Sequence, residues 1–152
     1  MSEYLRTTFD KFELRVRKGF YYTKDDIWIS RENDKVRVGI SDYLQKTSGD
    51  VAFVELAKSG LTVERGGEFG TIESAKTTVA LLSPISGRIN ETNSKLDGRP
   101  ELVNSDPYGE GWLVIVAPRN LDDDLQPLLS AEDYYKLMLE RLQSEHGKLE
   151  SR

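Results

Sequence analysis

Lys76 is the residue of this chain that could take part in chemistry, because of the residue types and spacing around it. It lies in the segment Glu73-Ser74-Ala75-Lys76-Thr77, between residues 69–72 and 78–82, which both read as short β-strands. A lysine at the tip of such a hairpin is lifted off the surface, where a modifying enzyme can reach its amine. The neutral amine is a nucleophile toward an activated acyl group, and the amide that forms has lost the positive charge. Because most turn lysines are merely solvated, the residues around this one decide its interpretation.

The spacing around Lys76 favours a modification site over an ordinary turn. Glu73 precedes it by three positions, Gly60 precedes it by sixteen, and Gly87 follows it by eleven. Glycines at such positions let two strands approach or turn where a side chain would clash.

This pattern resembles that of lipoyl domains, and among them the glycine cleavage H-protein family. The resemblance covers roughly residues 20 to 143 and is carried by Tyr22-Thr23-Lys24 with Trp28, and by residues 38–43, 49–56, 83–87 and 101–112. Biotin carriers share the fold and also modify a hairpin lysine, but that lysine normally sits between two methionines. Here Ala75 and Thr77 flank it, which favours lipoate.

The resemblance implies a role for each residue of the turn. Lys76 would carry lipoic acid in amide linkage, and Glu73 would help a lipoate ligase or lipoyltransferase to recognise the turn. Gly60 and Gly87 would act through backbone geometry. Four small residues would keep the turn uncluttered: Ser74, Ala75, Thr77 and Thr78.

The resemblance also implies a carrier that catalyses no turnover alone. In the family the lipoyl arm receives an aminomethyl group from a pyridoxal-phosphate-dependent glycine decarboxylase and presents it to a folate-dependent aminomethyltransferase. Dihydrolipoyl dehydrogenase, a flavoprotein, then reoxidises the dithiol. We expect the chain to be a monomer, because a carrier must visit several enzymes in turn.

Two departures from the family pattern keep other pathways open: an N-terminal segment of roughly 20 residues that is longer than the family usually shows, and the residue at position 26. The family typically continues Tyr-Thr-Lys with Glu-His-Glu-Trp, whereas this chain has Asp25-Asp26-Ile27-Trp28, so Asp26 stands in place of the histidine. An alternative is an H-like lipoate-binding protein that carries sulfur intermediates to a heterodisulfide-reductase-like complex in sulfur oxidation. A third hypothesis is an unmodified homologue that acts only as a binding module.

Composition excludes several other classes. The chain has 152 residues, no cysteine and a single histidine, His146, which argues against disulfides, thiolate metal sites and Ser-His or Cys-His catalysis. A net charge of −5 argues against nucleic-acid binding. No apolar segment approaches a membrane span, and the N-terminus suits neither a signal nor a transit peptide, so we expect a cytoplasmic protein.

The elements that must hold the lysine read as a mainly β protein with peripheral helices. Short strands are predicted at residues 28–31 and 35–38, a short helix capped by Ser41 at 41–46, and a buried strand bearing Phe53 at 51–56. Frequent glycines favour a flattened barrel or sandwich of the lipoyl-domain type, a barrel-sandwich hybrid. A C-terminal helix capped by Ser130 is predicted to pack on it through an apolar stripe of Tyr134, Tyr135, Met138, Leu139 and Leu142.

The chain divides into three parts. Residues 1–19 form an extension in which alternating apolar residues over 12–17 predict a half-buried strand that packs on the body. Residues 20–143 form a single lipoyl-carrier domain. Residues 144–152 are predicted to be a disordered tail.

Overall fold

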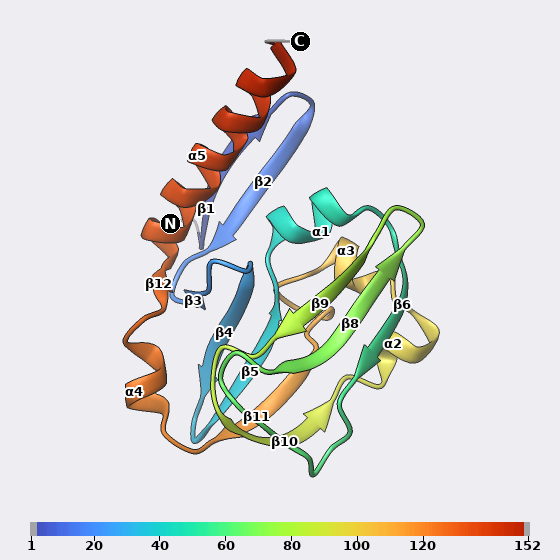
Figure 1. The fold of residues 1–152 in the computed structure, drawn as a ribbon, viewed down its shortest axis with the longest axis vertical. Helices are drawn as coiled ribbons and strands as arrows, with labels where there is room; N and C mark the ends of the chain where they lie inside the picture. Colours follow the sequence, from blue (N-terminus) through green and yellow to red (C-terminus); the bar gives the residue numbers. More distant parts are fainter. Residues whose placement is uncertain (1–2, 151–152) are drawn as a thin grey trace.

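Three antiparallel sheets make up the fold (Figure 1). The computed structural model describes residues 3–150, with side chains as far as residue 144. The largest sheet runs in the order β12 (Leu129–Ser130), β3 (Tyr21–Tyr22), β4 (Ile27–Glu32), β5 (Lys35–Ile40), β11 (Val114–Pro118), β10 (Gly87–Thr92) and β7 (Thr62–Val63). A second sheet has the order β6 (Val51–Leu56), β8 (Glu68–Ser74) and β9 (Thr78–Leu82). The third is a hairpin of β1 (Tyr4–Phe9) and β2 (Phe12–Arg17).

Five helices lie around these sheets in the described part of the chain: α1 (Asp42–Ser48), α2 (Lys95–Gly98), α3 (Leu102–Ser105), α4 (Leu121–Leu125) and α5 (Ala131–Glu150). Apolar residues of the two larger sheets meet in one core, which includes Ile29, Val38, Ile72, Leu81, Ile89 and Val116. Burial of these side chains drives the sheets together. The predicted fold class, a mainly β sandwich with peripheral helices and a C-terminal helix, is confirmed.

A second core lies on the other side of β4. The β1–β2 hairpin and α5 pack side by side there, over Trp28 and Tyr108 (Figure 1). Trp28 has no exposed surface, and its indole Nε1 donates a hydrogen bond to the Pro107 carbonyl at 3.1 Å. Strand β4 is therefore buried on both faces, with Ile27 and Ile29 in the first core and Trp28 in the second.

The indole of Trp28 occupies space that Gly39 leaves open. The two residues face each other across β4 and β5. A Cβ atom on Gly39 would lie 2.4 Å from Cζ2 of Trp28, which no side chain could tolerate. Glycine in the middle of a strand commonly marks such a close approach.

One prediction from the sequence, the burial of Phe53, is wrong. The strand expected at 51–56 is present as β6, but Phe53 is 65% exposed rather than buried. The register of β6 against β8 shifts between Val51 and Phe53, as at a β-bulge. The shift turns Val54, instead of Phe53, toward the core. Phe53 therefore lies on the solvent-facing side of β6, which is an edge strand of its sheet.

The C-terminal helix begins where the sequence predicts it. The Ser130 hydroxyl accepts a hydrogen bond from the Asp133 amide at 3.1 Å, and Tyr134, Met138 and Leu142 are buried against the second core. The backbone is helical as far as Glu150, past residue 144, where the sequence predicted a disordered tail. The end of that predicted tail, residues 151 and 152, lies outside the described residues.

A buried polar junction joins α5 to the body. The Tyr134 hydroxyl lies 2.7 Å from Asp26 Oδ1 and 2.7 Å from Ser41 Oγ, and Arg141 Nη1 donates to the same Asp26 oxygen at 2.5 Å. Burial raises the pKa of Asp26, while hydrogen bonds from Tyr134 and Arg141 oppose that shift. Burial also raises the pKa of Tyr134, so its hydroxyl remains a donor at neutral pH.

Removing the Tyr134 hydroxyl should destabilise the fold. Tyr134→Phe takes away a bond from a buried carboxylate and a partner from Ser41, so we expect a loss of ~1–3 kcal/mol in the free energy of unfolding, measured by urea denaturation. Tyr135→Phe is the matched control, because that hydroxyl donates to the Arg6 carbonyl at an exposed position. Equal losses in the two variants would contradict the junction's role.

Candidate functional site

The hairpin of β8 and β9 presents Lys76 at its tip. Glu73 pairs with Thr78 at the end of the ladder, and the Ser74 amide donates to the Thr77 carbonyl at 2.9 Å to close the turn. Ala75, Lys76 and Thr77 are all exposed. The tip lies at the edge of the molecule, beside the end of α1 (Figure 1).

The Ser74 hydroxyl organises the turn. Its oxygen accepts hydrogen bonds from the amides of Lys76 and Thr77, at 3.2 and 3.1 Å. The hydroxyl donates to the Ser48 carbonyl, at 2.6 Å, at the end of α1. One side chain thus shapes the tip and attaches it to a helix from another part of the chain.

Helix α1 also supports the lysine side chain. Lys76 Nζ donates to the Thr47 carbonyl at 2.7 Å, where the last carbonyls of α1 present the negative end of the helix dipole. Gly49 follows the helix at a φ of 83°, a left-handed conformation that favours glycine, and a Cβ there would make only ordinary contacts, at 3.9 Å, with Lys76 Cβ and Ser74 Oγ. The amine is exposed and is held at a defined place.

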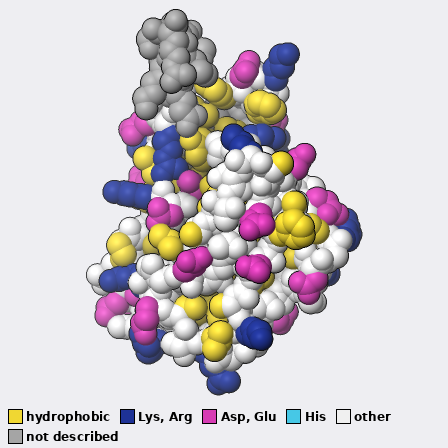
Figure 2. Space-filling view, turned by 45° about the vertical axis from the view of Figure 1, so that its right-hand side comes forward, with side chains coloured by type: hydrophobic (Ala, Val, Ile, Leu, Met, Phe, Trp, Pro, Cys, Tyr) yellow, Lys and Arg dark blue, Asp and Glu magenta, His cyan; other side chains and the backbone are white. Residues whose placement is uncertain are grey.

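Glu73 lies directly beside an exposed aromatic ring. Glu73 and Phe53 face each other across β8 and β6, and both line a small pocket of about 270 Å³ with Val54, Glu55 and Thr71. The face turned forward in Figure 2 shows acidic side chains dispersed around isolated apolar ones. Glu73 is exposed, as expected of a residue that a modifying enzyme could contact.

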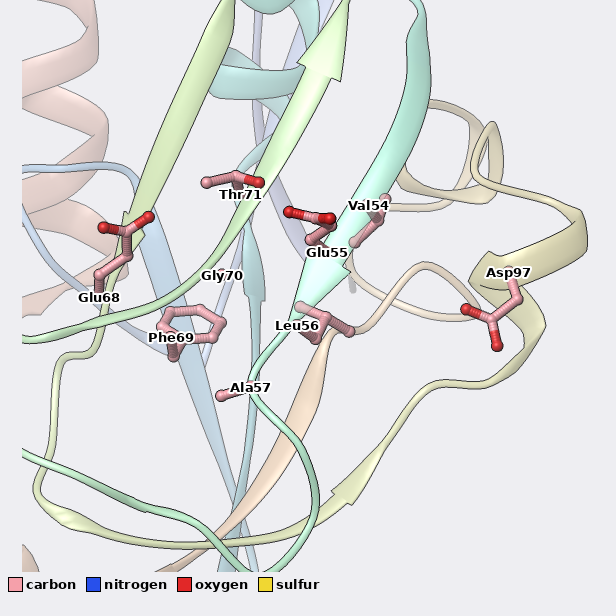
Figure 3. Close-up of a pocket in the computed structure, with 9 residues that line it drawn as sticks. All are labelled: Val54, Glu55, Leu56, Ala57, Glu68, Phe69, Gly70, Thr71 and Asp97. Carbon is pink, nitrogen blue, oxygen red and sulfur yellow. The ribbon is translucent and has the colours of Figure 1, made fainter.

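A larger groove crosses the same sheet at the end away from Lys76. It has a volume of about 600 Å³ and lies between the start of β8 and the end of β6 (Figure 3). Its polar lining includes three carboxylates, from Glu55, Glu68 and Asp97. Nevertheless, within the described residues no group of three or more His, Cys, Asp or Glu is placed to hold a metal ion.

The structure separates the predicted site residues into two groups. Glu73, Ser74, Ala75 and Lys76 lie together in the hairpin, whereas the two glycines lie in the body. Gly87 sits in β10 between β7 and β11, where an added Cβ would lie 2.3 Å from the Ala117 carbonyl oxygen. Gly60 has a φ of 95° in a turn, and its amide bonds to the Ile89 carbonyl. Both positions require glycine for backbone reasons.

Sequence reasoning missed the contribution of α1. The predicted helix ended at residue 46, before Thr47 and Ser48, whose carbonyls accept hydrogen bonds from the lysine hairpin. Twenty-six positions separate Ser48 from Ser74, and no local pattern signals that pairing. Asp26, which stands where the family pattern has histidine, contacts Tyr134 and Arg141 of α5.

Comparisons with known proteins agree on one family. The family model described as Glycine cleavage H-protein matches residues 20–141. The chain is 45% identical over 123 residues to the glycine cleavage system H protein of Thermus thermophilus, covering 81% of this chain and 95% of that protein. It is 49% identical over 113 residues to the one of Bacteroides fragilis, covering 74% and 89%.

A solved structure is similar as well. The crystal structure of a glycine cleavage system H protein from Mycobacterium marinum superposes with a TM-score of 0.73 at 36% identity, covering 80% of this chain and 98% of that chain. In the described part of the present structure, none of the helices is long and apolar enough to cross a membrane.

Loss of the Ser74 hydroxyl should loosen the tip. In Ser74→Ala we expect the amides of Lys76 and Thr77 to exchange with solvent roughly tenfold faster, because both lose their acceptor and the tip loses its bond to α1. Amide hydrogen exchange followed by NMR measures this. Thr77→Ala is the control, since it keeps both backbone groups of residue 77. Unchanged exchange in Ser74→Ala would show that the hydroxyl does not organise the turn.

Proposed function

The chain belongs to the glycine cleavage H-protein family, and from this premise we propose that it is a lipoyl-lysine carrier with lipoic acid in amide linkage to Lys76. The observation that carries the proposal is the exposed lysine at the tip of a short, hydrogen-bonded hairpin, with Glu73 three positions before it. A hairpin tip of small residues lets an attaching enzyme enclose the amine without meeting bulky neighbours.

The residues around Lys76 fit an acylated lysine. The side chain is exposed, so an acyl group can be added without displacing the core. An amide keeps one N–H on Nζ, and that N–H can still donate to the Thr47 carbonyl, which the ammonium contacts at 2.7 Å. When attached, the lipoyl group supplies a disulfide that opens to two thiols, one of which can hold a substrate fragment.

The exposed face around Glu73 and Phe53 offers groups that an attaching enzyme could recognise. Glu73 offers a carboxylate and Phe53 an apolar ring at adjacent positions, so an attaching enzyme with a basic group beside an apolar one would match both. Ser74 fixes the backbone that such an enzyme would grip. Gly60 and Gly87 contribute through the packing of the body rather than by contact.

We propose that the chain catalyses no turnover by itself and acts between partner enzymes. These partners would be glycine decarboxylase, aminomethyltransferase and dihydrolipoyl dehydrogenase. The proposal is supported by the relatives, which are named as H proteins of the glycine cleavage system. A lipoate ligase or lipoyltransferase would attach the arm. A cytoplasmic monomer suits such a carrier, since tethering replaces free diffusion with a high effective concentration at each partner.

The sulfur-oxidation alternative rested on Asp26 and on the longer N-terminus. In the structure Asp26 has a role within the fold, as the acceptor for Tyr134 and Arg141 of α5. The replacement of the family histidine therefore has an explanation that does not involve the substrate. For this reason we favour the glycine pathway over a partnership with a heterodisulfide-reductase-like complex.

Attachment at Lys76 can be tested by intact mass. After incubation with lipoate, ATP and a lipoate ligase, the protein should gain one lipoyl group, and Lys76→Arg should gain none. Glu73→Gln should be modified about 3–10-fold more slowly, because a charged contact with the ligase is lost. Glu91→Gln, an exposed strand glutamate in β10, should be modified at the rate of the unchanged protein. If ligases leave the unchanged protein without a mass gain, the binding-module hypothesis takes its place.

The substrate can be tested separately on the lipoylated protein. With glycine decarboxylase, we expect release of CO₂ from glycine to depend on the lipoylated chain, and lipoylated protein to accumulate one aminomethyl group by mass. The Lys76→Arg variant should support neither. A fully lipoylated protein that stays inert toward glycine would remove the glycine pathway and leave the carrier role in place.

A further inference from the structure

The N-terminal hairpin of β1 and β2 adds positive charge to an otherwise acidic protein. Residues 1–19 contain five basic and three acidic side chains, which gives a net charge of +2. The remaining 133 residues contain 16 basic and 23 acidic side chains, which gives a net charge of −7. The family match begins at residue 20, so the positive charge lies outside the matched region. Attraction for an anionic partner is therefore concentrated on this extension.

Three arginines of the hairpin gather around one tyrosine ring. On one face of the hairpin Tyr4 lies opposite Arg17, and Arg6 lies opposite Arg15. The guanidinium carbons of Arg6, Arg15 and Arg17 lie 5.9, 4.6 and 5.2 Å from the centre of the Tyr4 ring. We call these four residues the arginine face. The ring attracts the guanidinium groups and holds them together on one side of the hairpin, while the other side packs into the second core.

The arginine face places like charges directly opposite each other, at Arg6 and Arg15, which destabilises a pair of strands. Arg6 has a carboxylate nearby, from Glu13 at 3.8 Å. Within the described residues, none of the ion pairs involves Arg15. The Asp42 carboxylate accepts hydrogen bonds from the Arg15 main-chain amide, at 2.9 Å, and from the Gln45 side chain, at 2.7 Å. A carboxylate from another molecule would give the Arg15 guanidinium the anionic partner that it lacks.

The charges around the arginine face select a short anionic segment. Arg6 is exposed, and Arg15 and Arg17 are half-buried. Two exposed carboxylates flank these arginines, because Glu13 pairs with Arg6 and Glu3 pairs with Arg17, at 2.7 Å. A long polyanion such as nucleic acid would meet these carboxylates as well as the arginines, and the net charge of −5 would repel it further. A short acidic segment can meet the guanidinium groups alone.

The N-terminal hairpin also lies close to the proposed carrier lysine. Nζ of Lys46 in α1 lies 5.0 Å from the centre of the Phe12 ring, and Thr47, the next residue of that helix, accepts a hydrogen bond from Lys76. In Figure 1 the tips of the N-terminal hairpin and of the lysine hairpin point toward the same end of the molecule. An enzyme that takes up the lysine hairpin therefore comes close to the extension.

We infer that the arginine face docks an acidic segment of a partner protein, whose carboxylates pair with Arg15 and Arg6. The inference rests on the proposed carrier function only in taking a partner enzyme as the occupant. Arginine forms bidentate pairs with carboxylates, and an added carboxylate relieves the repulsion between the two opposed guanidinium groups. Such complementarity speeds encounter and selects partners. The extension thus adds a second recognition surface to the lysine hairpin.

The first test uses the unmodified protein and needs no lipoyl group. The probe is a blocked peptide with two glutamates on each side of a central leucine. It is titrated into the ¹⁵N-labelled protein to roughly 5 mM, because a contact of a few ion pairs is weak. We expect amide shifts at residues 4–6 and 15–17, and none from the same peptide with glutamines in place of glutamates. No shifts, or shifts spread over basic residues of the whole surface, would overturn the inference.

Variants locate the contact. Arg15→Gln should weaken peptide binding about 3–10-fold, because a charge-assisted pair is lost. Arg6→Gln, at a more exposed position, should weaken it too and keeps the test valid if the first variant folds poorly. Arg88→Gln is the charge-matched control, since Arg88 is exposed in β10, which lies far from the N-terminal hairpin in Figure 1. Equal binding by all three variants would contradict docking at the arginine face.

Other occupants give distinct results. Inorganic phosphate that produces the same shifts at lower concentration than the peptide would indicate a phosphate site and overturn protein docking. A mass in sedimentation velocity that rises with protein concentration, and rises less in Arg15→Gln, would make a second copy of this chain the occupant and would also overturn it.

The second test uses the lipoylated protein with the three proposed partner enzymes, after intact mass has established complete modification. We expect Arg15→Gln to raise the KM of at least one enzyme for the carrier about 3–10-fold with kcat unchanged, and added salt to shrink the difference. Arg88→Gln should leave KM unchanged. An unaltered KM for Arg15→Gln with every enzyme would overturn the inference and leave the carrier role standing. Failure of lipoylation would count against the proposed function alone, because the peptide test does not use the arm.

Discussion

The position of Lys76 is linked through α1 to a buried hydroxyl at the far end of that helix. Tyr134 bonds to both Asp26 and Ser41, and Ser41 is the N-cap of α1, accepting the Leu44 amide at 3.2 Å. The other end of α1 accepts hydrogen bonds from Ser74 and Lys76. A helix of seven residues therefore links the C-terminal helix to the tip of the lysine hairpin. Such a short helix is not stable alone, so its two ends must be held by their partners.

The second core explains why this body can carry additional elements. Strand β4 turns isoleucines toward one core and Trp28 toward the other, so both faces of the strand are used. The N-terminal hairpin adheres to this second face through direct bonds, among them Arg15 N to Asp42 Oδ2 at 2.9 Å and the Tyr108 hydroxyl to the Arg15 carbonyl at 2.7 Å. The hairpin is held to the body by apolar burial and by hydrogen bonds together.

Local patterns predicted most of what is local in this protein. The hairpin at residues 69–82, the caps at Ser41 and Ser130 and the apolar stripe of α5 follow from turn chemistry, capping and periodicity. Phe53 was misjudged because a bulge shifts the alternation by one position, and composition does not reveal a bulge. The bond between Ser74 and Ser48, and the pairing of Asp26 with α5, join residues far apart in sequence. Single-sequence patterns do not encode such contacts, since they arise only when the elements pack.

The contact between Trp28 and Gly39 also limits how the sequence can vary. The indole of Trp28 packs against the backbone of Gly39, and it fits there only because Gly39 has no side chain. A side chain at position 39 can be accommodated only after position 28 has lost its large ring, and loss of the ring first leaves a void in a packed core. Each single step passes through a poorly packed intermediate, so the two positions are linked in any gradual path of sequence change.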